Sequence, residues 1–164
     1  MKILQCSAMF IYILLFSPGM ISEPASQVAA VKKNDLPIKG SYTTVSEQLS
    51  GPPMVQLRIT GTGQSSHLGK GSFVALSTMN LTTAPPFTIG GTTTFYAANG
   101  DEFFTSFTGT ATPVSEGVLE VEMNHEITGG TGRFTNATGN FTGYTIAGPA
   151  NPVAHITYEG TISY

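Results

Sequence analysis

Short segments of alternating apolar and polar residues recur along this chain, each bounded by glycine, proline or Asn-Gly turn signals. Alternation with a period of two is typical of β-strands, because successive side chains point to opposite faces of a sheet. We predict eight strands, at Ile38–Gln48, Met54–Thr62, Gly71–Leu81, Thr92–Ala98, Glu102–Thr112, Val118–Thr128, Gly139–Ala147 and Val153–Ser163. So many strands with short connections favour an all-β fold, an eight-stranded antiparallel up-and-down β-barrel.

Turn signals and charge support closure of this sheet. Asn99-Gly100 fits a tight hairpin, because both central residues of such a turn need positive φ. The Pro-Pro pairs at 52–53 and 85–86 indicate loops, since proline cannot donate to a central β-ladder. A β-sandwich with Greek-key crossings uses similar strands and is the alternative. With only 10% charged residues, the chain has little charge to protect an exposed sheet edge. A closed barrel has no exposed edge, so closure would remove the need for such charges.

The segment Val118–Thr128 indicates which faces are wet and which are apolar. Glu120, Glu122 and Glu126 alternate with apolar residues, and the apolar face carries one histidine, His125. The second and eighth predicted strands show the same division into one polar and one apolar face.

The adjacent residues Phe103 and Phe104 in the fifth predicted strand do not follow this division, because they must point to opposite faces. Either one of them packs on a second layer or the strand carries a β-bulge.

Composition excludes several classes of protein. The chain has 164 residues, the length of one domain, and a formal net charge of −3. Seven Lys and Arg against ten Asp and Glu leave no basic surface for nucleic acid. Intrinsic disorder is excluded by 40% hydrophobic residues, with ten Phe and six Tyr among them.

The first residues are typical of a secretory signal peptide. Lys2 precedes an apolar run from Ala8 to Phe16, which Pro18 soon ends. This run is shorter than the roughly 20 apolar residues that cross a membrane, although an uncleaved anchor is the alternative. We expect residues 1–24 to be the signal peptide, residues 25–36 a flexible lead-in and residues 37–164 a single β-barrel domain. The exact cleavage site within the stretch from 19 to 30 stays open.

The only cysteine, Cys6, lies inside the predicted signal peptide. The mature chain would therefore contain no disulfide, no thiol nucleophile and no cysteine-bound metal. We predict a secreted or periplasmic protein that has no membrane contact after the signal is cleaved.

A glycine-rich stretch near the C-terminus carries a resemblance to a known family. Residues 129–139 read Gly-Gly-Thr-Gly-Arg-Phe-Thr-Asn-Ala-Thr-Gly. This stretch resembles the hairpin that joins two late strands in the allene oxide cyclase-like and dirigent-like β-barrels, which are calycin-type folds. The resemblance implies an eight-stranded barrel, and a family that includes cyclases, stereochemical guides, dimers, trimers and secreted members of no known activity. It brings over no catalytic residue, because no position outside the hairpin matches.

The hairpin residues themselves indicate a structural role. Gly129, Gly130 and Gly132 allow backbone angles that are closed to other residues, so the chain can leave one strand sharply. We expect Phe134 to plug the barrel end and Gly139 to open the next strand. A phosphate-binding loop is rejected, because the stretch lacks both the Gly-Lys-Ser/Thr and the Gly-x-Gly-x-x-Gly signatures.

The interior of the predicted barrel supplies the candidate ligand-binding residues. His125 is either a general acid/base or ligand-orienting group, or a buried histidine satisfied by a neighbouring hydroxyl, which we favour. Inward aromatic residues are either plain core or the lining of a small apolar pocket, because an eight-stranded barrel has room for little more. The residues we assign to such a pocket are His125, Tyr158, Met123 and Phe73.

Metal, cofactor and glycosidase chemistry find little support. His67 falls in a predicted loop and His155 on a wet face, and no two histidines share a strand at ligand spacing, so we expect no metal and no cofactor. The carboxylates of Glu120, Glu122 and Glu126 have a spacing that permits glycoside hydrolysis. A row of carboxylates opposite an apolar row is far more typical of a solvated surface.

Together these features predict a barrel module of no assignable catalysis that binds a small apolar ligand in its lumen. One alternative is a cyclase or isomerase of the same fold. Another is a structural or surface-interaction protein whose barrel is filled by its own side chains. We expect no nucleic-acid partner, and the resemblance is compatible with a homo-oligomer.

Overall fold

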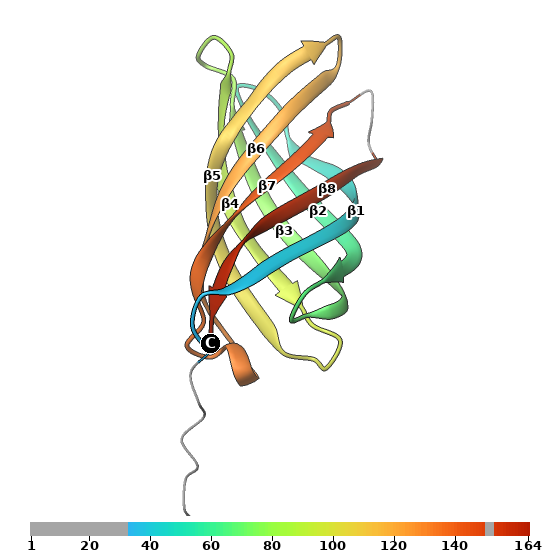
Figure 1. The fold of residues 1–164 in the computed structure, drawn as a ribbon. Helices are drawn as coiled ribbons and strands as arrows, with labels where there is room; N and C mark the ends of the chain where they lie inside the picture. Colours follow the sequence, from blue (N-terminus) through green and yellow to red (C-terminus); the bar gives the residue numbers. More distant parts are fainter. Residues whose placement is uncertain (1–32, 150–152) are drawn as a thin grey trace, which may run out of the picture. The chain divides into compact units, whose positions relative to one another are not determined.

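Eight antiparallel strands close into a barrel in the computed structural model, which describes residues 33–149 and 153–164 (Figure 1). Each strand pairs with its neighbour in the chain, and β8 pairs with β1, so the predicted up-and-down topology is confirmed and the Greek-key sandwich is wrong. The strands are β1 (Leu36–Ser50), β2 (Met54–Ser65), β3 (Gly69–Asn80), β4 (Phe87–Tyr96), β5 (Glu102–Ser115), β6 (Val118–Gly130), β7 (Thr138–Ala147) and β8 (Val153–Ser163).

The largest error in the predicted strands concerns β4, which begins at Phe87 rather than at Thr92. The Gly90-Gly91 pair reads as a turn signal in the sequence, but both glycines are paired within the sheet. A Cβ atom on Gly91 would lie 1.9 Å from the carbonyl oxygen of Leu76. Glycine therefore serves here to let two strands approach closely, and it does not end the strand.

The N-terminal predictions are only partly within the described residues. The predicted signal peptide at 1–24 and residues 25–32 of the lead-in lie outside them. Lys33 exchanges two backbone hydrogen bonds with Tyr164, and Leu36, predicted to end the lead-in, already belongs to β1. Within residues 33–149 and 153–164, no helix has the length and apolar character needed to cross a membrane.

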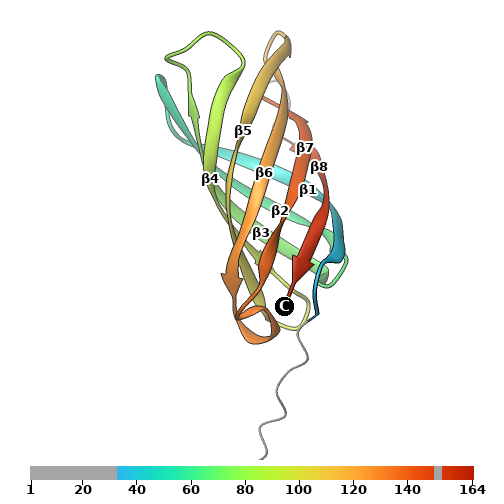
Figure 2. The same cartoon turned by 60° about the vertical axis from the view of Figure 1, so that its left-hand side comes forward.

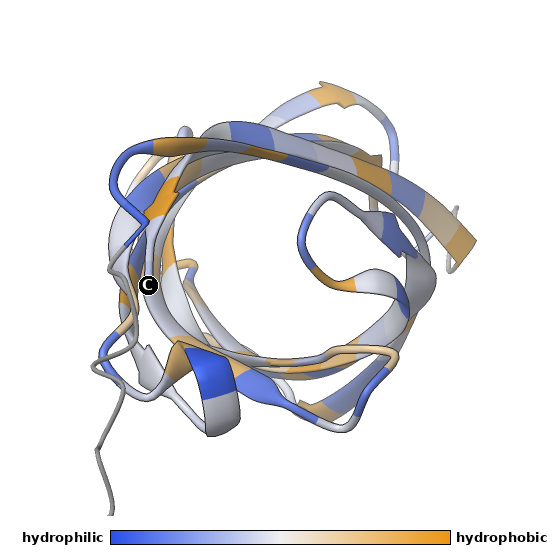
Figure 3. Ribbon diagram, turned by 60° about the horizontal axis from the view of Figure 1, so that its bottom comes forward, coloured by the Kyte–Doolittle hydropathy of each residue, from blue (hydrophilic) through white to orange (hydrophobic). Residues whose placement is uncertain are grey.

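The alternation in β6 divides the inside of the barrel from the outside as predicted. Met123, His125 and Ile127 are buried in the interior, and Glu120 and Glu126 are exposed on the outer surface. Viewed along the barrel, polar and apolar residues alternate along the ribbons (Figure 3). The acidic row is thus a solvated surface of the barrel.

The adjacent residues Phe103 and Phe104 point to opposite faces. Phe103 is fully buried, whereas Phe104 lies half-buried on the outer face. The pairing register shifts beside them, because Phe104 pairs with Gly129 and Thr105 pairs with Ile127, which leaves Thr128 as an extra residue in β6. At this point the irregularity therefore lies in β6, and β5 keeps its alternation through Phe103 and Phe104.

Inward-facing glycines make room for aromatic rings on neighbouring strands. In five cross-strand pairs a glycine lies directly opposite an aromatic residue whose side chain covers it, so that an added Cβ would lie under 3 Å from that side chain. These pairs are Gly40 with Tyr158, Gly61 with Phe73, Gly63 with Tyr42, Gly91 with Phe107 and Gly160 with Phe141. An eight-stranded barrel is narrow, so a glycine at the opposite position leaves room inside for a large ring.

The aromatic rings gather toward one end of the barrel and fill it. This packed end is closed by the 3₁₀ turn η1 (Gly132–Phe134), whose Phe134 is fully buried against Phe103 and Tyr164. The same end carries the C-terminus, and Figure 2 shows η1 beside it. The cluster of buried residues here is Ile38, Tyr42, Leu68, Phe73, Ala75, Phe95, Ala97, Phe103, Ile127, Phe134, Ala137, Phe141, Tyr158 and Ile162.

The glycines of the hairpin between β6 and β7 have two different functions. Gly129 and Gly132 have φ angles of 129° and 53°, and Gly139 has one of 136°, which favour glycine at all three positions. Gly130 differs from the sequence-based expectation, because its φ lies outside this region. Glycine is required at position 130 because there is no room for a side chain: a Cβ there would lie 2.2 Å from the carbonyl oxygen of Glu102.

We predict that Phe134→Ala destabilises the barrel by about 3–5 kcal/mol, because it removes a fully buried aromatic ring from the packed end. Urea unfolding followed by circular dichroism measures this loss. Leu76→Ala is the control, since Leu76 is 52% exposed on the outer face of β3 and its truncation should cost under about 1 kcal/mol. Equal losses in the two variants would contradict a plugging role for Phe134.

Candidate functional site

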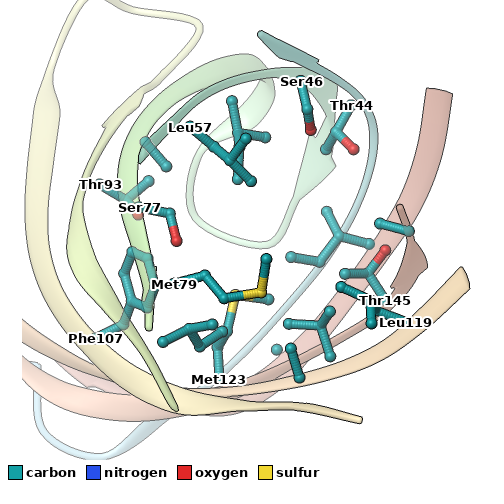
Figure 4. Close-up of a pocket in the computed structure, with 18 of the residues that line it drawn as sticks. Thr44, Ser46, Leu57, Ser77, Met79, Thr93, Phe107, Leu119, Met123 and Thr145 are labelled. Atoms are coloured by element: carbon teal, nitrogen blue, oxygen red, sulfur yellow. The ribbon is translucent and has the colours of Figure 1, made fainter. Parts of the chain in front are cut away.

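The half of the barrel opposite the packed end encloses a cavity of about 390 Å³. Its mouth lies among the β1–β2, β3–β4 and β7–β8 connections, where Pro52, Leu81 and Pro149 line it. The side chains of Leu57, Ser77, Met79 and Met123 project into this space (Figure 4). The cavity is therefore the open end of a lumen whose other end is filled.

A layer of aromatic rings forms the floor of the cavity. Phe73, Phe95, Phe141 and Tyr158 belong both to the packed cluster and to the cavity lining. Phe95 lies among the others, with its ring centroid 5.3 Å from that of Phe73 and 5.9 Å from that of Phe141. These rings separate the filled half of the barrel from the open half.

The cavity walls are largely apolar. A second buried cluster of Ile89, Phe107, Ala111 and Met123, with Met79 packed against it, covers one side. Methionine is flexible and polarisable, so Met79 and Met123 suit a wall that adjusts to its contents. Along the described chain, the cavity lining includes no Asp, Glu, Lys or Arg.

The polar groups of the lining are neutral hydroxyls, one amide and one imidazole. The hydroxyls of Thr44 and Thr145 donate to carbonyl oxygens of β8, at 3.3 Å from Ala154 and 2.9 Å from His155. These two hydroxyl groups therefore already have hydrogen-bond acceptors within the wall. The buried hydroxyl of Thr93 has no hydrogen-bond partner among the residues that the structure describes.

His125 lies in the floor between two aromatic rings. Its ring stacks on Phe141 with centroids 4.6 Å apart and planes 12° apart, and Phe107 lies 4.9 Å away on the adjacent strand. The Nδ1 atom is 3.0 Å from the hydroxyl oxygen of Thr105. The neighbouring hydroxyl expected from the sequence is thus present, and His125 also lines the cavity.

Burial lowers the pKa of His125 to about 4, from an ordinary value of 6.5. The apolar surroundings disfavour the imidazolium cation, and the ring's described contacts, with Thr105, Phe107 and Phe141, bring no carboxylate to offset this. His125 is accordingly a neutral imidazole at neutral pH.

The other three predicted pocket residues also reach the cavity. Met123 forms part of a wall, and Phe73 and Tyr158 form part of the floor. The hydroxyl of Tyr158 donates to Ser65 at 2.8 Å, toward the packed end, and burial raises its pKa. Tyr158 therefore presents its ring to the cavity and turns its polar group away from it.

Several lining residues were not singled out by the sequence analysis. Apolar residues on inward faces, such as Leu57 and Val121, could have been found from their alternation alone. The hydroxyl groups of Ser77 and Thr93 could not, because Ser and Thr are common on both faces of these strands.

The remaining histidines and carboxylates lie elsewhere. His155 is exposed on the outer face, where Nε2 is 2.8 Å from the hydroxyl of Ser41, and His67 contacts Pro37 and Tyr164 at the packed end. In the part of the chain that the structure describes, no three His, Cys, Asp or Glu residues come together as a metal site.

Comparisons with protein-family models, with curated protein sequences and with solved structures found no match for this chain.

We predict that the free energy of unfolding falls as the pH is lowered from about 6.5 to about 4, because the unfolded chain binds a proton at His125 before the folded barrel does. The slope due to this one group reaches about 1.4 kcal/mol per pH unit. Urea unfolding at several pH values measures it. His125→Phe should flatten the dependence in this window, and an unchanged slope would contradict the assignment.

Proposed function

We propose that this chain is a secreted or periplasmic binding module whose barrel takes up one small, neutral, apolar molecule. The observation that carries the proposal is the cavity of about 390 Å³ with apolar walls and an aromatic floor. Small-molecule sites in proteins measure roughly 300–1,000 Å³, so the cavity suits a single small ligand.

The chemistry of the walls supports a neutral ligand. Moving apolar surface from water into the cavity gains roughly 25 cal/mol per Å². A charged ligand would lose its hydration without gaining a counter-charge, because the described lining carries no ionised side chain.

The cavity also bears on the two alternatives. A structural barrel filled by its own side chains would leave no such volume, so the open half favours ligand binding. A cyclase or isomerase needs a group that exchanges protons near the working pH. The pKa of His125 is lowered to about 4 and that of Tyr158 is raised, so we favour binding without catalysis.

We also propose that the barrel is related to the allene oxide cyclase-like and dirigent-like proteins. Support comes from the hairpin at 129–139, which joins β6 to β7 as the resemblance implies, and from the up-and-down order of the eight strands. Within that family, we propose that the chain belongs with the members without assigned catalysis.

We predict that the neutral fluorophore N-phenyl-1-naphthylamine binds the protein with a blue-shifted, enhanced emission, and that Leu57→Trp weakens this binding by about tenfold or more. Leu57 is half-buried and projects into the cavity, so a larger side chain extends into open space rather than into packed neighbours (Figure 4). Fluorescence titration gives both dissociation constants.

Leu76→Trp is the matched control, because Leu76 lies on the outer face of the adjacent strand β3, one position before the cross-strand partner of Leu57. This variant should bind the fluorophore like the wild type. No binding to the wild type, or equal weakening in both variants, would contradict the proposed function. Mass spectrometry of molecules retained by natively purified protein then identifies the ligand.

We predict that the full chain expressed in a secreting host is exported and cleaved between Gly19 and Ala30. The intact mass of the exported protein locates the cleaved bond. A chain of the full 17.2 kDa recovered from membranes would instead support the uncleaved anchor.

A further inference from the structure

The hydrogen bond between Thr105 and His125 determines which ring nitrogen carries the proton. Thr105 is 2% exposed, and its hydroxyl has the Nδ1 atom of His125 as its one partner within residues 33–149 and 153–164. If Thr105 donates, Nδ1 accepts and the proton of the neutral ring is on Nε2. The opposite tautomer would leave the buried hydroxyl proton of Thr105 without an acceptor, which is unfavourable.

The Nε2 atom faces a small recess in the cavity lining. Across the described chain no group forms a hydrogen bond with Nε2, and the atom is not sealed from the cavity. The recess exists because residue 143 of β7 is glycine. A Cβ atom on Gly143 would lie 3.8 Å from Nε2, 3.5 Å from the Met123 methyl carbon and 3.6 Å from Cδ1 of Ile156.

A donor of this kind, placed in an apolar recess, is satisfied only by something that enters the cavity. The neutral state of the ring, which follows from its lowered pKa, means that it offers a hydrogen bond and no charge. A carboxylate would find no cation among the described lining residues. The chemistry therefore selects a neutral acceptor atom.

We propose that the ligand carries a neutral oxygen acceptor, such as that of a ketone, ester or ether, which enters the recess at Gly143 and accepts a hydrogen bond from Nε2–H of His125. The apolar remainder of the ligand then extends toward the mouth. This inference rests on the proposed binding function and adds the chemical class of the ligand. Thr105 acts as a positioning residue, because it sets the tautomer without reaching the ligand.

The test uses two probes that differ by one group. Benzophenone has a carbonyl oxygen where 1,1-diphenylethylene has a CH₂ group, and the two molecules are otherwise alike. Each is titrated against bound N-phenyl-1-naphthylamine, and the ratio of the two dissociation constants is compared between variants. We expect His125→Phe to raise the dissociation constant of benzophenone, relative to that of 1,1-diphenylethylene, by about three- to tenfold. This change corresponds to the loss of one net hydrogen bond.

A second variant tests the same proposal independently, so that the test remains valid even if His125→Phe does not fold. Gly143→Ala adds a methyl group that meets its neighbours only at ordinary van der Waals distances, and it fills the recess. It should also shift the ratio against the ketone. Thr142→Ala is the matched control, because Thr142 is exposed on the outer face and should leave the ratio unchanged.

The role of Thr105 has its own readout. Nitrogen-15 shifts of the imidazole should place the proton on Nε2 in the wild type and in Thr105→Ser, and on a mixture of both nitrogens in Thr105→Val. A merely structural role for Thr105 would change stability without moving the tautomer.

The outcomes separate this inference from the function on which it rests. If N-phenyl-1-naphthylamine binds but the ketone-to-alkene ratio is the same in wild type, His125→Phe and Gly143→Ala, the binding function stands and the acceptor proposal is overturned. A proton found on Nδ1 in the wild type also overturns it. If the fluorophore does not bind to the wild type at all, both fail.

Discussion

The division of this barrel into a filled half and an open half depends on the packing of the Phe95 ring. This ring packs within 4.6 Å of Phe103 and within 5.7 Å of Tyr158, measured between ring centroids, as well as against Tyr42, Phe73 and Phe141. Aromatic pairs in edge-to-face or offset arrangements add about 0.5–1.5 kcal/mol each beyond the burial of their area. A layer joined in this way resists displacement, so the depth of the cavity above it is set by the packing below.

The cavity itself arises from a change in side-chain size along the inward rows. On β3 and β7 the inward positions pass from Phe73 to Ala75 and Ser77, and from Phe141 to Gly143 and Thr145. The lumen of an eight-stranded barrel is just filled by large side chains. Where the inward residues are small, as they are on these two strands, the same lumen stays open.

The sequence was sufficient for the strands, and for the inward position of His125, because both follow from a period of two within one segment. It was misleading at Gly90-Gly91, where glycine serves close approach between strands. The hydrogen bond from Thr105 to His125 could not be predicted, because it depends on the register between β5 and β6, which an irregularity between Pro113 and Ser115 shifts near the turn that joins the two strands. The Gly143 recess likewise needs three strands to be placed side by side before it is visible.

The connections at the packed end bear on how this protein can be handled. The C-terminal Tyr164 is tied to that end by Phe134 and by the backbone of Lys33, whereas the mouth opens among the loops at the opposite end. A linker joined to Tyr164 would therefore attach the barrel to a bead, a display scaffold or an electrode with its opening facing the surrounding solution. The fold thus provides its own orientation for immobilised capture of small molecules.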